Sequence, residues 1–355
     1  MRKWVWCLLA LGVMGCDRDE VAPVAVKKVP VWGVDVQSVT PLPANRVTHV
    51  TPGKSGAVFW VQESEAGHET VFVMSEGSVP VSTTLTSGAI AQAFGVNSVT
   101  GNVQSLVAAS DGKIYFYFTG GKGKRLLCGL GCYTPENGRT RIVADTAELM
   151  SQSEMGDSIS LARGTLLLAG DQLWVWLRHD DGYAVLSAGV RGGDVKLRRA
   201  FVTVRGNGEE IRMTSAGADL AIGAENSLIY MDRRTRKIWK IGELGEAAEA
   251  GDVSDLPAGL TAPSVDEKGR MVFFAPEEIP LNEFEIMAAT RPSKFPGLVI
   301  LDGSVQTVLG RAVFTAPAKF NVRAMAVGQL VRDRTGWLAY ERQTGELLRL
   351  RVVER

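Results

Sequence analysis

Histidine is scarce in this chain, and the recognisable signals of catalytic and metal sites are missing. Only three histidines occur, His49, His68 and His179, and none stands in a motif with a serine or carboxylate partner. A nucleophilic triad needs a base that a third group orients. The chain also has no glycine-rich phosphate loop, calcium loop or motif of paired catalytic carboxylates. We therefore predict no catalytic residue, no metal ligand and no cofactor.

An excess of charge of either sign is missing as well. Lysine plus arginine number 39, and aspartate plus glutamate also number 39. Proteins that bind nucleic acid usually carry a basic stripe, so we expect no nucleic-acid partner. Hydrophobic residues make up 45% of the chain, which is enough to bury a core.

Long apolar runs are also lacking, and the segment 4–14 at the N-terminus is a short one. A helix that spans a bilayer needs about 20 apolar residues, and this segment has 11. Arg2 and Lys3 precede it, and a short apolar run behind a basic start is typical of a signal peptide. We therefore expect residues 1–15 to be a signal peptide.

That segment ends in Val13-Met14-Gly15-Cys16, a stretch that resembles the lipobox of bacterial lipoproteins. The resemblance implies lipidation of Cys16, cleavage before it and acylation of the new amine. Several acyl chains together give stable membrane anchoring. The alternative is an ordinary secretory signal in which Cys16 is incidental.

Residues 16–30 contain charges and two prolines, and we expect them to form an extended, lipidated tether. The rest of the chain would then lie on the extracytoplasmic side of a bacterial cell-envelope membrane. The sequence leaves open whether that is the inner or the outer membrane.

Beyond residue 30 the chain consists of short runs rich in valine, isoleucine, leucine and aromatic residues, separated by glycine, aspartate and asparagine. This pattern is typical of strands and tight turns. Helical periodicity is scarce, and the two segments that favour a helix are 146–153 and 242–250.

The strand-rich runs repeat along the chain. One aromatic residue marks each of six units: Trp60, Phe116, Trp174, Tyr230, Phe274 and Tyr340. Their spacings are 56, 58, 56, 44 and 66 residues, and regular repeats of roughly this length mark propellers and related arrays. Each unit has two strong strands with weaker strands on both sides, as a four-stranded propeller blade does. We therefore predict that residues 31–355 form an all-β propeller of six blades; the alternative is a pair of β-sandwiches or another all-β array.

A single blade exposes both faces of its sheet, so a ring of blades is expected to close on itself. We expect the run 31–39 to pair with the last blade and close the ring. The stretches 110–116, 228–240 and 265–273 resemble the turn-and-strand core of NHL-type six-bladed propellers. This resemblance implies the fold and no particular activity.

Two of the four cysteines remain after Cys7 is removed with the signal peptide and Cys16 is lipidated. They are Cys128 and Cys132, with two glycines between them. An extracytoplasmic compartment permits a disulfide, and glycines allow a short loop to bend. We expect a local disulfide, with two free thiols as the alternative. No histidine lies nearby to complete a zinc site.

Two further segments deserve a prediction of their structure. The stretch 179–182, His-Asp-Asp-Gly, is expected to be a hairpin turn. The stretch 275–293 contains Glu277, Glu278 and Glu283 and several prolines, and we expect a long surface loop of the fifth blade. Such insertions on a propeller often carry binding.

Two classes of function fit these observations. The first is a membrane-anchored, non-enzymatic lipoprotein whose propeller recognises a protein or a cell-envelope ligand. The alternative is a propeller enzyme of the lactonase or lyase type with a metal in its central channel. The sequence leaves open the ligand, the oligomeric state and the face of the propeller that is used.

Overall fold

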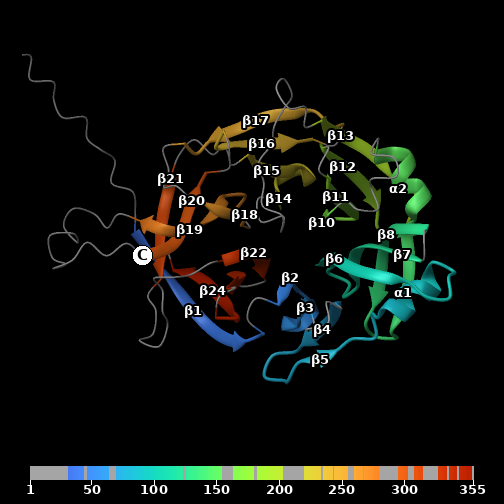
Figure 1. Cartoon of the computed structure of the whole chain (residues 1–355). Helices are drawn as coiled ribbons and strands as arrows, with labels where there is room; N and C mark the ends of the chain where they lie inside the picture. Colours follow the sequence, from blue (N-terminus) through green and yellow to red (C-terminus); the bar gives the residue numbers. More distant parts are fainter. Residues whose placement is uncertain are drawn as a thin grey trace, which may run out of the picture.

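The computed structural model describes most of the chain after residue 30. The described ranges are 31–43, 46–63, 69–122, 125–153, 163–179, 182–202, 220–232, 235–242, 244–254, 260–266, 268–279, 295–302, 308–314, 327–333, 336–341 and 344–353. Within them the chain is almost entirely β-structure, and the strands are grouped into six blades around a common centre (Figure 1). The predicted all-β, six-bladed propeller is therefore confirmed.

Each blade is a sheet of four antiparallel strands, numbered outward from the centre. Blade one contains β2 (Val47–Pro52), β3 (Val58–Glu63), β4 (Glu69–Met74) and β5 (Val81–Ser82). Blade two contains β6 (Thr100–Ala108), β7 (Ile114–Lys122), β8 (Arg125–Thr134) and β9 (Arg139–Ala144). Blade three contains β10 (Arg163–Ala169), β11 (Gln172–His179), β12 (Gly182–Gly189) and β13 (Lys196–Val202).

The second half of the ring repeats this arrangement. Blade four contains β14 (Leu220–Ile222), β15 (Leu228–Asp232), β16 (Lys237–Ile241) and β17 (Ala247–Asp252). Blade five contains β18 (Thr261–Val265), β19 (Met271–Ile279), β20 (Phe295–Leu301) and β21 (Val308–Phe314). Blade six contains β22 (Val327–Asp333), β23 (Gly336–Glu341), β24 (Glu346–Val353) and, as its outermost strand, β1 (Val31–Pro41).

The first strand of the chain closes the ring. Strand β1 pairs with β24 in antiparallel fashion from Gly33, opposite Val353, to Pro41, opposite Glu346. This pairing confirms the predicted closure by residues 31–39. The first residues of β1 also pair in parallel with β21, which joins blades five and six into one eight-stranded sheet.

The hydrophobic core is divided among the six interfaces between neighbouring blades. Six clusters of buried side chains fill these interfaces, one cluster for each pair of adjacent blades. All six aromatic residues that mark the repeat lie on the second strand of a blade and are buried. Because the sheets cannot cover their own faces, this packing against both neighbours is what stabilises the ring.

Hydroxyl groups link neighbouring inner strands near the centre. The Thr51 hydroxyl on β2 accepts a hydrogen bond of 3.1 Å from the backbone N–H of Ala108 on β6. The buried Ser105 hydroxyl on β6 accepts one of 3.0 Å from the N–H of Leu166 on β10. These bonds satisfy backbone donors that no sheet partner reaches, and they fix the register between blades.

Two short helices lie outside the blades. Helix α1 (Ser87–Ala93) begins after Thr86, whose hydroxyl accepts from the Ala89 N–H. Helix α2 (Thr146–Ser153) follows Asp145, whose carboxylate accepts from the Glu148 N–H while the Glu148 carboxylate accepts from the Asp145 N–H. This reciprocal capping explains why the predicted helix 146–153 is present.

The helix predicted over 242–250 is wrong. The Gly242 N–H donates to the Glu246 carbonyl at 3.0 Å, Gly245 has φ +87°, and strand β17 follows from Ala247. Ile241 and Ala247, which flank these residues, are paired. The alanines and glutamates of this stretch favour a helix, but their pairing with β16 as the fourth strand of blade four outweighs that propensity.

The propeller has two distinct faces. We call the turn face the one that carries the connections between the first and second strand of each blade, such as 53–57 in blade one and 223–227 in blade four. Both ends of the described chain lie at this face. Strand β23 begins here at Gly336, opposite Asp333, and the antiparallel strand β24 therefore ends here at Val353. Val353 pairs with Gly33, so β1 begins at the same face. No helix in the described part of the chain is long and apolar enough to cross a membrane.

Candidate ligand pocket

A pocket of about 330 Å³ opens on the turn face, where the inner strands of three neighbouring blades end. It is lined by Pro52, Gly53, Lys54, Ala108, Ala109, Ser110, Arg332 and Asp333. These residues come from the last positions of β2, β6 and β22 and from the turns that follow. Pockets of this size accommodate a small ligand or a single chemical group of a larger one.

The turn that carries Lys54 is a single 3-10 turn closed by two backbone hydrogen bonds. The Gly53 N–H donates to the Ala57 carbonyl at 2.7 Å, and the Ala57 N–H donates to the Lys54 carbonyl at 3.2 Å. Gly53 has no room for a side chain, because a Cβ atom there would lie 2.7 Å from the Phe59 ring. The backbone therefore holds Lys54 at a fixed place on the pocket rim.

Blade four has the same kind of turn without the lysine. There the Gly223 N–H donates to the Ser227 carbonyl at 2.8 Å, and Ala224 occupies the position that corresponds to Lys54. The turn itself thus has no need of a cationic side chain. Lys54 is a feature of the pocket in blade one.

The acidic residue of the pocket is already neutralised by an arginine. The Asp333 carboxylate lies 3.0 Å from Nε of Arg349, and both side chains are largely buried. Arg349 also donates to the Gly56 carbonyl at 3.4 Å and lies 4.0 Å from Glu76, so it ties blade six to blade one. Buried charges are stable only when paired in this way.

Two cationic side chains line the pocket rim. Lys54 is exposed and has no ion-pair partner among the described residues. Arg332 is exposed beside it, and Ser110 adds a hydroxyl group. Two cations and a hydroxyl group around a small concave site favour a carboxylate or phosphate oxygen.

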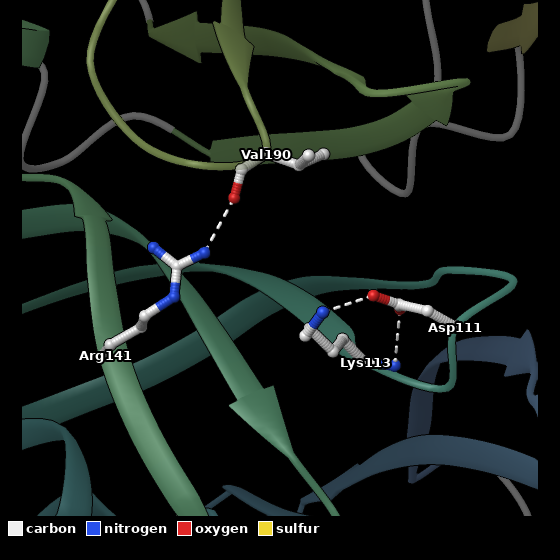
Figure 2. A network of polar contacts seen from close by, with 4 residues as sticks. All are labelled: Asp111, Lys113, Arg141 and Val190. Atoms are coloured by element: carbon white, nitrogen blue, oxygen red, sulfur yellow. Dashed lines mark hydrogen bonds and ion pairs between the residues drawn. The ribbon is translucent and has the colours of Figure 1, made fainter.

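A network of polar contacts in blade two involves Asp111, Lys113 and Arg141 and reaches Val190 of blade three (Figure 2). The Arg141 guanidinium donates to the carbonyl oxygens of Val190 at 2.7 Å and of Arg191 at 3.4 Å. Lys113 forms an ion pair with Asp111 across the turn that leads into β7. The contacts of Arg141 satisfy backbone carbonyls and join blades two and three, whereas the ion pair of Lys113 stabilises the turn within blade two.

The disulfide expected between Cys128 and Cys132 is not formed. Both residues are free, buried thiols on the single strand β8. Four residues of extended strand separate their Cα atoms by about 13 Å, beyond the span of about 7 Å that a disulfide bridges. Burial raises the pKa of the Cys128 thiol to about 12 and also raises that of Cys132, so both are unreactive core residues.

The two glycines between these cysteines have a packing role. A Cβ atom on Gly131 would lie 2.0 Å from the Phe116 ring, and one on Gly129 would lie 2.6 Å from Phe94. They therefore give space to aromatic rings on the side of β8 that faces blade one, while the cysteines face blade three. The stretch 128–132, in which we expected the two glycines to let a short loop bend, is part of strand β8.

The face opposite the turn face carries a pair of carboxyl groups. Glu63 and Glu69 are directly opposite each other at the hairpin end of β3 and β4. Burial, and then the charge of Glu63, raise the pKa of Glu69 to about 7. Sequence reading missed this pair, because five residues separate the two glutamates and only strand pairing brings them together.

The other residues that the sequence analysis names are dispersed. His49 is buried on the inner strand of blade one, while His179 is at the end of β11 in blade three, where its pairing with Gly182 confirms the predicted hairpin. Cys16 and His68 lie outside the described residues. Among the described residues no group of three histidine, cysteine, aspartate or glutamate side chains is placed to hold a metal ion.

The predicted loop 275–293 begins later than expected. Strand β19 continues to Ile279, and the pairing of Ile279 with Phe295 extends the hairpin of blade five. Glu277 and Glu278 are therefore strand residues, and Glu283 lies outside the described residues.

The chain matches no protein-family model and no curated protein sequence. Among solved structures it is similar to a putative gluconolactonase, with 13% identity and a TM-score of 0.50 over 91% of this chain and 94% of that one. It is also similar to virginiamycin B lyase from Staphylococcus aureus, with 11% identity and a TM-score of 0.46 over 90% and 100%. A gluconolactonase from Xanthomonas campestris has 10% identity and a TM-score of 0.46 over 92% and 99%. At this identity the likeness to the putative gluconolactonase is one of fold alone.

Proposed function

We propose that this protein is a lipid-anchored binding propeller of the bacterial cell envelope. Cys16 carries the anchor, and the pocket on the turn face takes an anionic group, a carboxylate or a phosphate, of an envelope ligand. The observation that supports this most is the charge of the rim. Lys54 and Arg332 line the pocket, Lys54 has no ion-pair partner among the described residues, and the charge of Asp333 is balanced by Arg349.

The pocket is tested by a titration with inorganic phosphate followed by phosphorus NMR. We expect Lys54→Ala and Arg332→Ala each to weaken phosphate binding about tenfold, because a hydrogen bond to a charged group contributes about 1.5–3 kcal/mol. Arg139→Ala is the matched control, since Arg139 is exposed on the turn face outside the pocket. Equal affinity in all four proteins would refute the assignment of the pocket.

The anchor is tested separately by fractionation of cells that express the full chain. The parent protein is expected in the membrane fraction, with palmitate incorporated, and Cys16→Ala is expected in the soluble fraction. A Cys16→Ala protein that stays in the membrane would contradict lipid anchoring through this residue. Metal analysis of the same purified protein addresses the lactonase or lyase alternative, which one tightly bound divalent ion per chain would favour.

A further inference from the structure

We infer that the turn face of the propeller rests on the membrane surface, with apolar turn tips inserted among the lipids. This inference rests on the proposed lipid anchor, and it adds an orientation that the anchor alone does not specify. The evidence is the position of the exposed aliphatic side chains, the place where the chain leaves the propeller and the charge of the face.

Exposed aliphatic side chains gather at the turn-face end of the blades. Among the described residues five large hydrophobic side chains are exposed, and Val79, at 79%, and Leu244, at 89%, are the most exposed of them. Val81 and Val353 lie at the same end, and only Val39 lies away from it, toward the opposite end of β1. Single exposed hydrophobic residues are common, but their collection on one face is not.

The two most exposed side chains occupy the tips of equivalent turns. Val79 lies between β4 and β5, and Leu244 lies between β16 and β17. The second strands of blades one and four begin on the turn face, at Val58 and Leu228. Strand β4 ends opposite Val58 and β16 ends opposite Leu228, so both strands end on this face. Both tips therefore project from this face.

Blades one and four stand on opposite sides of the six-bladed ring (Figure 1). The two apolar tips can therefore contact one surface on opposite sides of the propeller axis. If both enter the same lipid surface, the line that joins them across the ring lies parallel to that surface. A single tip would allow the propeller to tilt.

The N-terminal chain leaves the propeller at this face. Val31, the first residue of β1, pairs next to the end of β24, and Cys16 precedes it by 15 residues. A chain of that length extends at most about 50 Å. The anchor therefore limits the distance between the start of β1, at the turn face, and the bilayer to about 50 Å at most.

Outside the pocket that Lys54 and Arg332 line, several lysines of this face are compensated by carboxylates. Lys113 is paired with Asp111, Lys196 with Asp194, and Lys240 with Glu225, all on turns of this face or the strand ends beside them. Charges compensated in this way give no strong attraction to an acidic surface. Insertion of aliphatic tips is then the main contact, as in other proteins that lie at a membrane interface.

The test uses the full lipidated chain in phosphatidylcholine vesicles, with a polarity-sensitive fluorophore on an added cysteine. The variants are Val79→Cys and Leu244→Cys, and the control is Thr100→Cys, an exposed position at the opposite face in blade two. Cys128 and Cys132 are buried and are not expected to react. We expect the first two labels to be shielded from aqueous iodide several-fold more than the control and to be quenched by a nitroxide lipid.

Each other outcome identifies a different error. Equal iodide quenching at all three positions in vesicle-bound protein overturns the inference while the anchor stands. Protein that does not remain on the vesicles shows that the proposed anchor has failed. Shielding that needs phosphatidylglycerol means that charge holds the face, and shielding in detergent with a dimeric protein means that a second copy covers it. Either result overturns docking by apolar tips.

Discussion

At the scale of single residues, the carboxyl group of Glu69 makes the stability of blade one depend on pH. Its pKa is about 7 in the folded protein, mainly because of burial, whereas the ordinary value is 4.5. Between these values the folded chain binds more protons than the unfolded chain, so stability falls as pH rises through this window. The loss is complete above the folded pKa.

Glu69→Gln should remove this loss. We expect its free energy of unfolding to exceed that of the parent by about 1–2 kcal/mol at about pH 8 and to be nearly equal at about pH 5; the full pKa shift is discounted because the side chain is partly exposed. Urea denaturation at the two pH values measures this, with Glu136→Gln on an exposed turn as control. The same difference at both pH values would argue against titration of Glu69.

Residue-level prediction from the sequence succeeded where a residue acts locally and failed where it acts across strands. The hairpin at His179 was predicted because turn chemistry is local. The cysteines were misread because Gly129 and Gly131 admit rings from Phe94 and Phe116, which are distant in sequence. Spacing alone carries no information about such contacts.

At the scale of elements, strand β1 is the part whose removal should cost most. Val34 is fully buried against side chains of blades five and six, and β1 is paired along both β24 and β21. Without it, blade six has an unpaired edge and blade five loses its link to the last blade. The ring would then be held closed only by side-chain packing.

Deletion of residues 31–40 is therefore expected to lower the melting temperature by about 10 °C or more, since about 1 kcal/mol corresponds to a few degrees in a chain of this size. Thermal unfolding followed by circular dichroism measures the change. A deletion of 17–30, which leaves β1 in place, is the control and should melt like the parent. An unchanged melting temperature after loss of 31–40 would disprove closure by this strand.

The strands were easier to predict than the helices. The buried aromatic residue in each second strand gave the number of blades, because that strand packs against both neighbouring blades. Helix α1 was missed, since its seven residues include glycine and few apolar positions that show a helical period. Helix α2 was found because it combines a capping box with good helix formers.

At the scale of the whole molecule, the candidate pocket exists only after the ring has closed. Lys54 and Arg332 are 278 positions apart in the sequence, and they meet because the last blade packs against the first. No local pattern marks either residue. A comparison of the blades gives one signal, because the turn of blade one begins with Lys54 where the equivalent turn of blade four begins with Ala224. The fold was therefore predictable from periodicity, while the site required coordinates.

The central claim is that this pocket receives an anionic group, and a crystal structure of the protein grown with selenate tests it most directly. The anomalous signal of selenium locates the anion without ambiguity. We predict selenate in the pocket, within hydrogen-bond distance of Lys54 and Arg332, and no such signal there in Lys54→Ala. Selenate bound elsewhere on the propeller, with this pocket left to water, would contradict the account.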